Sequence, residues 1–324
     1  MNNISTLRND KTTFFGKHGK LHVSGKHLLD SNNNIVQLRG ISTHNLSSFP
    51  QYVNIETFKW FVDTFNVSVI RLAMYSDFAD GDNGYSDGTD EHRSELISLI
   101  LKGVDICSKL GIYCLIDWHI LFDYNPLMNK DMSVDFWKRI CPLLKESDNV
   151  IYEICNEPNM NLKTKETATW YDIKTYSNEI IPLIRSIDED KIIIVGTPIW
   201  SQNVNEAADS PLDYDNIMYS LHFYADTHKE ELRKKMYYAL DKELPIFVTE
   251  FGPCDALGDG IINDKETNIW LDALNKELIS FIDWNLSNKD ETSAIIKPSC
   301  DKLENFTADD LSASGLLLKD ILMY

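Results

Sequence analysis

Glu157 and Glu250 each end a short apolar run, and a pair of carboxyl groups placed in this way can hydrolyse a glycosidic bond. Glu157 closes the segment Val150-Ile-Tyr-Glu-Ile-Cys-Asn-Glu157, and Glu250 closes Pro245-Ile-Phe-Val-Thr-Glu250. In a retaining mechanism one carboxylate attacks the anomeric carbon, while the other protonates the leaving oxygen and later deprotonates water, with the two groups about 5–5.5 Å apart. Their environments must differ, because the nucleophile has to be ionised while the acid/base still carries its proton.

Further polar or aromatic residues end other apolar runs and would support this pair. The set comprises His44, Arg71, Tyr75, His119, His222, Tyr224 and Trp284. A guanidinium such as that of Arg71 suits the nucleophile, because a nearby positive charge favours the ionised carboxylate. His222 and Tyr224 can donate hydrogen bonds to either glutamate. These residues form one site only if the fold brings the ends of the runs together.

Eight apolar runs alternate with segments of helical spacing. The runs cover residues 35–41, 69–73, 112–117, 150–154, 191–195, 217–222, 245–250 and 280–284. Between them apolar residues recur three and four positions apart, as in the stretch 136–144. This alternation predicts an α/β fold, specifically a (β/α)8 TIM barrel in a single domain. Active sites of TIM barrels lie at the carboxyl ends of the strands, so the run ends are expected to converge on one mouth.

The N-terminal and C-terminal segments are expected to frame this barrel. Two short apolar segments, Leu21-His-Val-Ser24 and His27-Leu-Leu-Asp30, flank a turn with glycine and predict a β-hairpin that plugs the bottom of the barrel. Residues 1–15 are expected to form a loose lead-in, and residues 16–324 the catalytic domain. The segment from Ser312 onward would form the closing helix.

The charge of the chain argues against one class of partner. With 50 acidic and 31 basic residues the formal net charge is -19, whereas nucleic-acid binding depends on clustered Lys and Arg. An uncharged polysaccharide or oligosaccharide is compatible with this charge, and 14 Tyr, 14 Phe and 7 Trp supply rings for the core and for sugar faces. We expect a monomer without a membrane segment, since no apolar run approaches about 20 residues.

The cysteines and the first residues bear on the cellular compartment. Six scattered cysteines without a CxxC pair predict buried thiols rather than a zinc site or a disulfide framework. The beginning MNNISTLRND lacks the basic and apolar regions of a signal peptide. Two alternatives follow, a cytoplasmic protein or one that is secreted or held at the cell surface after removal of its signal. The predicted chemistry needs no cofactor and no metal.

The segment Tyr152-Glu-Ile-Cys-Asn-Glu-Pro158 resembles the Asn-Glu-Pro signature of clan A glycosidases, specifically the bacterial endo-β-1,4-glucanases (cellulases) of glycoside hydrolase family 5. The resemblance extends, in the family's order, over roughly residues 20 to 324. It includes Ile70-Arg-Leu-Ala-Met-Tyr75, Asp117-Trp-His-Ile-Leu121, Trp200-Ser-Gln202, Leu221-His-Phe-Tyr224, Phe247-Val-Thr-Glu-Phe-Gly252 and Asp283-Trp-Asn-Leu-Ser-Asn-Lys-Asp-Glu291. It implies a retaining enzyme that cuts internal β-1,4-glucosidic bonds of cellulose or related β-glucans.

The resemblance also implies individual roles. Glu157 would be the acid/base, Glu250 the nucleophile, and Asn156 a hydrogen-bonding partner of the sugar 2-hydroxyl. The residues that would hold the carboxylates and the sugar are Arg71, His119, His222 and Tyr224. The residues that would contact sugar faces on either side of the cleavage point, or hydroxyls at the non-reducing side, are Trp200, Trp284, Lys289 and Glu291.

One departure from the family bears on specificity. Cellulases of this family commonly carry a Trp four residues after the histidine that matches His44, and this chain has Ser48 there. Either a stacking platform is absent or Phe49 replaces it. By analogy with base stacking, such a ring contributes about 1–3 kcal/mol, so its loss would weaken binding of long glucans without stopping cleavage.

Several alternatives remain open. A β-mannanase or a xyloglucan- or mixed-linkage-glucan-specific enzyme would use the same scaffold, and a non-catalytic glycan-binding barrel would keep the aromatic residues. A metal-dependent hydrolase would want paired ligands such as His-x-His at the first strand, where Ser42-Thr-His-Asn45 supplies one histidine. The segment from Asp255 to Glu266 partly fits a calcium loop, but Leu257 occupies its third position.

Overall fold

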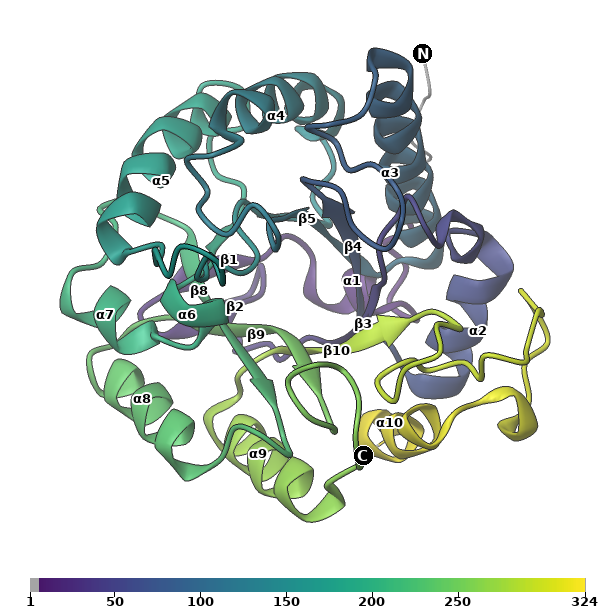
Figure 1. The fold of residues 1–324 in the computed structure, drawn as a ribbon. Helices are drawn as coiled ribbons and strands as arrows, with labels where there is room; N and C mark the ends of the chain where they lie inside the picture. Colours follow the sequence, from purple (N-terminus) through teal and green to yellow (C-terminus); the bar gives the residue numbers. More distant parts are fainter. Residues whose placement is uncertain (1–5, 324) are drawn as a thin grey trace.

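The computed structural model describes residues 6–323 and confirms the predicted (β/α)8 barrel. Eight parallel strands close in the order β10-β3-β4-β5-β6-β7-β8-β9, and helices form a ring outside them (Figure 1). The barrel strands are β3 (Arg39–Thr43), β4 (Val69–Tyr75), β5 (Tyr113–His119), β6 (Val150–Glu153), β7 (Ile193–Val195), β8 (Ile217–Tyr224), β9 (Ile246–Gly252) and β10 (Phe281–Leu286). Each strand overlaps one of the eight predicted runs.

The boundaries of the first strand differ most from the prediction. The apolar run covers residues 35–41, whereas β3 spans Arg39–Thr43. Val36 and Leu38 are buried in the cluster that fills the bottom of the barrel, and Ile35 bridges to Leu29 of the hairpin. The front half of the run is therefore apolar because it belongs to the plug, not because it belongs to the barrel wall.

The outer helices carry the predicted amphipathic faces. They are α2 (Ile55–Phe65), α3 (Asp90–Leu110), α4 (Lys130–Leu144), α5 (Trp170–Arg185), α6 (Pro198–Ser201), α7 (Val204–Asp209), α8 (Glu230–Asp241), α9 (Asp264–Glu277) and α10 (Ala313–Met323), with short 3-10 helices at Pro50–Tyr52 and Ala308–Asp310. Their start points follow from capping side chains. Thr169 caps α5 in a reciprocal capping box with Asp172, and Asn54 caps α2 through the amide of Thr57. No helix among residues 6–323 is long and apolar enough to cross a membrane.

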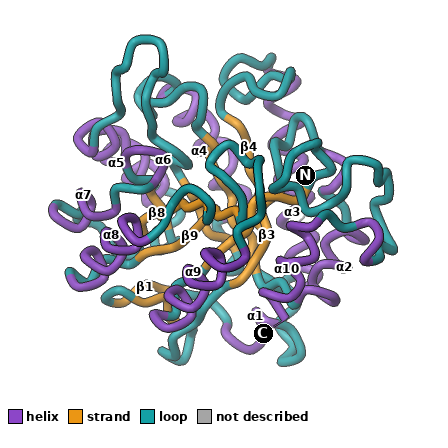
Figure 2. The backbone as a smooth tube through the Cα atoms, turned by 60° about the horizontal axis from the view of Figure 1, so that its bottom comes forward, coloured by secondary structure: helices purple, strands orange, loops and turns teal. Residues whose placement is uncertain are grey.

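The predicted hairpin is confirmed at the bottom of the barrel. Strands β1 (His22–Ser24) and β2 (His27–Leu29) pair antiparallel, and Figure 2 shows β1 and helix α1 (Phe14–His18) at the end of the molecule away from the longest loops. Leu21 and Leu28 pack with inward-facing residues of the barrel strands, among them Leu115. The bottom is thereby sealed with apolar side chains, which leaves the opposite mouth for polar chemistry.

The lead-in predicted for residues 1–15 is partly packed. Residues 1–5 lie outside the described part of the chain. From Arg8 onward the segment contacts the barrel, since the Arg8 amide donates to the Ser108 carbonyl at 2.9 Å and Phe15 is buried.

Candidate active site

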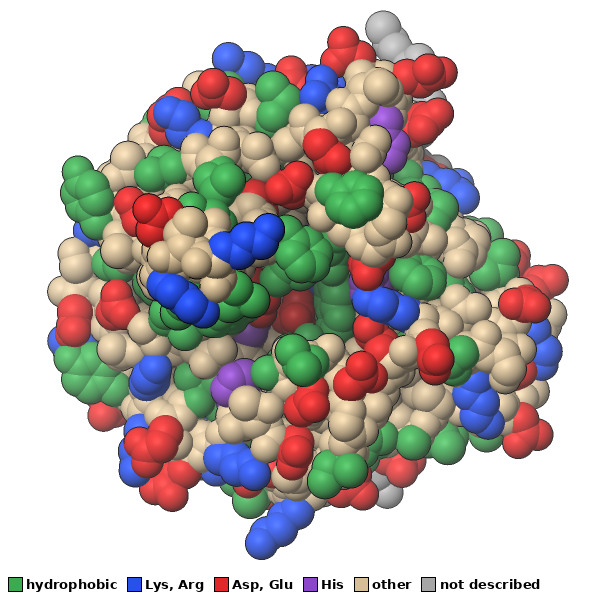
Figure 3. Space-filling view, in the orientation of Figure 1, with side chains coloured by type: hydrophobic (Ala, Val, Ile, Leu, Met, Phe, Trp, Pro, Cys, Tyr) green, Lys and Arg blue, Asp and Glu red, His purple; other side chains and the backbone are tan. Residues whose placement is uncertain are grey.

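An open cleft of about 990 Å³ lies at the carboxyl ends of the barrel strands. Figure 3 shows it as a hollow near the middle of the face, with acidic side chains at its floor. All predicted site residues line this cleft except Arg71 and Asn156, which lie beneath it. The lining residues from the prediction are His44, Tyr75, His119, Glu157, Trp200, His222, Tyr224, Glu250, Trp284, Lys289 and Glu291.

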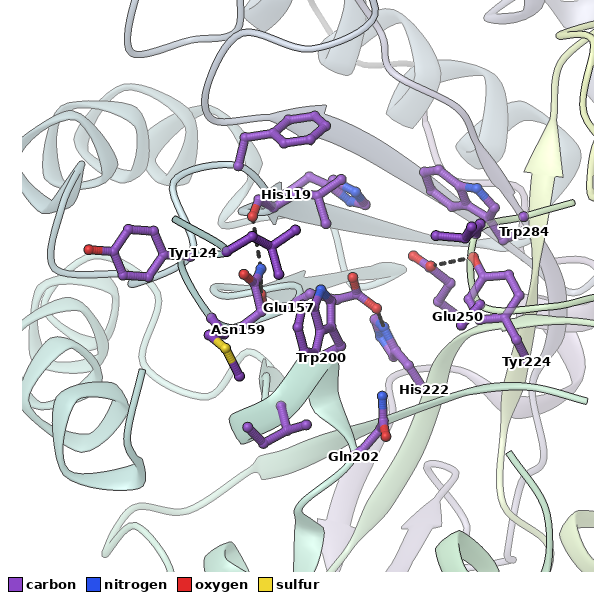
Figure 4. A pocket seen from close by; sticks show the side chains of 18 of the residues that line it. His119, Tyr124, Glu157, Asn159, Trp200, Gln202, His222, Tyr224, Glu250 and Trp284 are labelled. Atoms are coloured by element: carbon purple, nitrogen blue, oxygen red, sulfur yellow. Dashed lines mark hydrogen bonds and ion pairs between the residues drawn. The ribbon is translucent and has the colours of Figure 1, made fainter. Parts of the chain in front are cut away.

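Glu157 and Glu250 face each other across the floor of the cleft (Figure 4). One carboxylate oxygen of each, together with a ring nitrogen of His222, lie within 4.8 Å of one another. Glu250 belongs to β9, where it is in register with His222 of β8, and Glu157 follows the end of β6. This separation fits the short spacing of a retaining pair and leaves no room for the water that an inverting pair holds at about 6.5–9.5 Å.

Glu157 has the environment of a proton donor. Its Oε1 lies 2.9 Å from Nδ1 of His222. Burial raises the pKa of Glu157 to about 8, and the negative charges of Asp117 and Glu153 act in the same direction while Arg71 opposes them. The carboxyl group therefore keeps its proton at neutral pH.

Glu250 is held between two donors. The Tyr224 hydroxyl donates to Oε1 at 2.8 Å, and the guanidinium of Arg71 donates to Oε2 at 3.3 Å. Burial and the charge of Glu157 raise the pKa of Glu250 to about 7, against the lowering effects of His222, Arg71 and Tyr224. Because Tyr224 and Arg71 both donate to Glu250, the single-proton state of the pair has Glu250 ionised and Glu157 protonated.

Arg71 is the buried cation under this site. Its side chain is fully buried and contacts Glu153 at 2.8 Å, Asp117 at 3.0 Å and Glu250 at 3.3 Å. Burial lowers the pKa of Arg71, but the three carboxylates raise it by more, so that the guanidinium stays charged. Losing one partner of such a buried network leaves an uncompensated charge, which costs several kcal/mol, about 3–5.

Asn156 connects Arg71 to the cleft wall. Its Oδ1 accepts from Arg71 at 2.6 Å, and its Nδ2 contacts the Ile120 carbonyl at 3.0 Å and Nε2 of His119 at 3.2 Å. Nδ1 of His119 in turn lies 2.6 Å from Asp117. The amide of Asn156 thus has protein partners at both ends, and its predicted contact with the sugar 2-hydroxyl stays a prediction.

Aromatic rings stack along one side of the floor. Tyr75 lies over His119 with ring centroids 4.1 Å apart, and His119 stacks on Trp284 at 5.2 Å. His44 contacts both Tyr75 and Trp284. Only 6% of Trp284 is exposed. Its ring is therefore held in place by its neighbours and presents one face to the cleft.

Trp200 is presented by a strained turn on the other side of Glu157. Ile199, Trp200 and Ser201 have φ values of 60°, 53° and 54°, a left-handed run that costs roughly 1–3 kcal/mol per residue. The turn is tied to the catalytic segment, since the Trp200 amide donates to the Pro158 carbonyl at 3.0 Å and the Ser201 hydroxyl donates to the Asn156 carbonyl at 2.6 Å. These two hydrogen bonds hold the strained turn in place, and the turn positions the Trp200 ring at the cleft.

Gly196 lets this turn lie against the Glu157 segment. A Cβ at this position would stand 2.1 Å from the Cys155 carbonyl oxygen and 2.7 Å from that of Asn156. Both distances are far below a normal contact, so the close approach of the β7 end to the β6 end requires glycine.

Lys289 joins the loops after β4 and β10 above His44. Its ammonium group lies 2.9 Å from Asp80, 3.1 Å from Glu291 and 3.3 Å from Nε2 of His44. Burial lowers the pKa of His44 to about 4, with Lys289 acting in the same direction. The predicted hydroxyl-binding pair of Lys289 and Glu291 is therefore a triad with Asp80, which sequence analysis did not include.

At the Ser48 position the structure favours the absence of a stacking platform over its replacement by Phe49. Neither Ser48 nor Phe49 is among the lining residues. Phe49 contacts His44 edge-on at 5.1 Å and packs against the core, so it does not replace the missing ring. Large apolar side chains occur on other loops at the rim, where Phe122 is 65% and Leu162 is 68% exposed.

Four further residues belong to the site although sequence analysis gave them no role. Asp117, Glu153 and Thr249 form the buried layer beneath the two glutamates. His228 lines the cleft, and its Nδ1 accepts from the Tyr224 amide at 2.9 Å. The sequence does indicate a role for Asp117 and Glu153. A charged residue inside an apolar strand is costly unless it is paired, so its presence there predicts a buried partner.

The side chains that could bind a metal, at the floor of the cleft and in the loop after β9, already have partners within the protein. Glu157, His222 and Glu250 are close enough to hold a cation, but each already has a protein partner, and Arg71 supplies positive charge 3.3 Å from Glu250. In the acidic loop after β9, Oδ1 of Asp255 accepts from the amides of Leu257 and Asp259. That carboxylate stabilises its own turn, as in an Asx turn.

Comparisons with known proteins agree with the predicted family and fold. The family model described as cellulase, glycosyl hydrolase family 5, matches residues 29–290. Endoglucanase A of Butyrivibrio fibrisolvens is 44% identical over 98% of this chain, and an endoglucanase of Clostridium saccharobutylicum is 42% identical over 95% of it. The chain spans 71% and 65% of the lengths of these two relatives.

A solved structure of the same kind superimposes closely. The catalytic domain of endoglucanase Cel5A from Thermobifida fusca, a variant in complex with cellotetraose, has a TM-score of 0.88 and 30% sequence identity. The match covers 96% of this chain and 100% of that domain.

Proposed function

The chain belongs to glycosyl hydrolase family 5, the cellulase family, and from this premise we propose that it hydrolyses internal β-1,4-glucosidic bonds of glucans with retention of configuration. The observation that carries the mechanism is the pair of carboxylates, Glu157 and Glu250, with oxygens within 4.8 Å at the floor of an open cleft. Two acids at this spacing perform a double displacement. The activity is that of an endoglucanase.

In the first step Glu250 attacks the anomeric carbon. The bond from this carbon to the glycosidic oxygen breaks, and the proton of Glu157 moves to the leaving oxygen. Tyr224 and Arg71 keep the attacking carboxylate oriented through its two oxygens. Burial of Glu157 favours its protonated form before the step, as a general acid requires.

In the second step Glu157 acts as a base. It removes a proton from water, whose oxygen attacks the anomeric carbon and releases Glu250 as a carboxylate. Two inversions restore the original configuration, and both carboxyl groups return to their starting protonation states.

The cleft supports binding of sugars on both sides of the cleavage point. Trp284, Lys289 and Glu291 line one side, and Trp200 lines the other. A glucan bound between these two sides is cut internally. The uncharged rings of Trp200 and Trp284 suit the apolar faces of glucose rings. We further propose that the protein acts as a monomer outside the cell, because the cleft is complete within one chain and polymeric glucan is an extracellular substrate.

The test compares wild type with Glu250→Gln on four polymers. Reducing-sugar release is measured from carboxymethylcellulose, mixed-linkage β-glucan, xyloglucan and mannan. We expect release from carboxymethylcellulose and mixed-linkage β-glucan, lost in the variant at unchanged folding. Release from mannan or xyloglucan alone would keep the mechanism and replace the substrate. A folded wild type that releases sugar from none of them would favour a glycan-binding protein.

A further inference from the structure

His222 connects the acid/base to a buried hydroxyl. Its Nδ1 lies 2.9 Å from Oε1 of Glu157, and its Nε2 lies 2.8 Å from Oγ1 of Thr249. Thr249 is fully buried, and its hydroxyl also lies 2.6 Å from Oε1 of Glu153. Three side chains from β8, β9 and β6 thus continue a hydrogen-bonded chain from Glu157 into the barrel.

The direction of these hydrogen bonds follows from Glu153. Three donors converge on its carboxyl group: Arg71 on Oε2 at 2.8 Å, and Ser220 and Thr249 on Oε1 at 2.7 and 2.6 Å. Burial raises the pKa of Glu153, and the charge of Arg71 opposes this. The ion pair with Arg71 and the two hydroxyls at Oε1 favour the carboxylate, which accepts from all three donors. The Thr249 hydroxyl therefore donates to Glu153, which is a stronger acceptor than the Ser220 hydroxyl 2.9 Å away. Its oxygen is left as an acceptor for His222.

This arrangement fixes the tautomer of the histidine. If the Thr249 oxygen is an acceptor, Nε2 of His222 must carry the hydrogen. Burial lowers the pKa of His222 to about 4, so the ring is neutral and its Nδ1 carries only a lone pair. That lone pair faces Oε1 of Glu157 and can only accept.

From these contacts we propose that Thr249, anchored on Glu153, is a positioning residue that holds His222 as the Nε2–H tautomer and so favours the protonated form of Glu157. The inference rests on the proposed function, because it assigns Thr249 to the acid/base of that reaction. Before the first step Glu157 carries the proton and donates it in a hydrogen bond to Nδ1; in the first step this bond breaks and the proton moves to the leaving oxygen. After it, the Glu157 carboxylate faces a lone pair instead of a donor, which makes it a stronger base toward water in the second step.

Other charges around the two groups act on Glu157 and His222 independently of Thr249. The titratable groups that face them are Arg71 and Tyr75 of β4, Asp117 and His119 of β5, Glu153 of β6, Tyr224 of β8, Glu250 of β9 and His228 after β8. A test must therefore change the hydroxyl and keep every charge. Thr249→Val removes the hydroxyl at nearly constant shape, and Thr249→Ser retains it. Ser220→Ala removes the other hydroxyl at Oε1 of Glu153; Ser220 also lies 2.9 Å from Oγ1 of Thr249 but does not contact His222.

The decisive measurement is the ¹⁵N spectrum of histidine-labelled protein, in which the two ring nitrogens report the tautomer directly. The His222 signals are assigned with His222→Gln. We expect the Nε2–H tautomer in the wild type and in Thr249→Ser across the pH range in which Glu157 titrates. In Thr249→Val the Nδ1–H form should appear as Glu157 ionises. A wild type with the Nδ1–H tautomer overturns the proposal, even if the valine variant does not fold.

A kinetic readout accompanies the spectrum. In Thr249→Val the ionised Glu157 gains a donor, so its pKa falls and the basic limb of kcat/KM on an aryl cellobioside moves to lower pH by about one unit, the size expected for one charged hydrogen bond. Thr249→Ser and Ser220→Ala should keep the limb in place. An unmoved limb in a folded valine variant contradicts the proposal. The tautomer is read without substrate, so a protein that cleaves no glucan would refute the proposed function and still answer this question.

Discussion

The Tyr224 hydroxyl donates a hydrogen bond of 2.8 Å to Oε1 of Glu250, the oxygen that Arg71 does not hold. This bond stabilises the ionised nucleophile and lowers its pKa. Tyr224→Phe should therefore raise the pKa of Glu250 and move the acidic limb of the kcat/KM profile to higher pH by about one unit, with about a fivefold loss at pH 7. Tyr214→Phe, which removes a hydroxyl bound to Asn178 outside the cleft, should leave the limb unchanged. Equal profiles for both variants would refute the role of Tyr224.

The pH profile of the wild type should be a narrow bell. Activity needs Glu250 ionised and Glu157 protonated. Below about 7 Glu250 takes up a proton, and above about 8 Glu157 loses its proton, so kcat/KM should be greatest between these values. A profile that stays flat from about pH 5 to 9 would show that this carboxyl pair does not control the reaction.

Small anions should distinguish the two glutamates. In Glu157→Ala, substrates with good leaving groups should still form the glycosyl-enzyme, and azide should then release it as a β-glycosyl azide after two inversions. In Glu250→Ala, azide takes the place of the missing nucleophile, and one inversion gives the α-azide. Product configuration by NMR is the measurement. The same anomer from both variants would contradict the assignment of roles.

Trp200 should matter more for long substrates than for short ones. Its ring faces the side of the cleft away from Trp284, so Trp200→Ala should raise KM for cellohexaose by about tenfold or more while changing KM for an aryl cellobioside little. The figure corresponds to about 1–3 kcal/mol for one stacked ring. Trp200→Phe is the matched control because it keeps a ring. If alanine affects both substrates equally, the residue supports the fold of the strained turn rather than sugar binding.

Gly196→Ala should impair catalysis through the backbone. The new Cβ would collide with the Cys155 carbonyl and shift the segment that carries Glu157, and misplacement by about 1 Å can cost 10²-fold in rate. Gly103→Ala is the control, since its Cβ meets only the flexible end of Leu72. Both variants are expected to lose stability, measured by urea unfolding. Only Gly196→Ala should lose kcat out of proportion to the folded fraction.

Sequence reasoning was sufficient for the fold because each strand carries its own signal. The eight apolar runs correspond to the eight strands, and the hairpin before them was recognisable from its turn. The beginning of β3 was misplaced because Val36 and Leu38 are as apolar as a strand but pack against the plug. Apolar character reports burial, and it does not tell one buried partner from another.

The site was predictable where a residue ends a strand, and less so where it lies below one. His222 and Tyr224 end β8 and line the cleft as expected. Thr249 and Glu153 lie within strands and act through other residues, so only the register between β6, β8 and β9 brings them together. Asp80 was missed because it lies in a long loop whose path no periodicity describes.

Within residues 6–323, Arg71 is the one cation in contact with the buried carboxylates Asp117, Glu153 and Glu250. In the proposed reaction, Glu250 loses its negative charge when it bonds to the sugar, and Glu157 gains one when it gives up its proton. In the second step the two changes reverse. The guanidinium therefore opposes the same total charge in the free enzyme and in the covalent intermediate. Because the total charge of Glu157 and Glu250 stays the same, the buried groups have little need to rearrange between steps. A barrel whose opposite end is closed by packed side chains can therefore hold them in one arrangement.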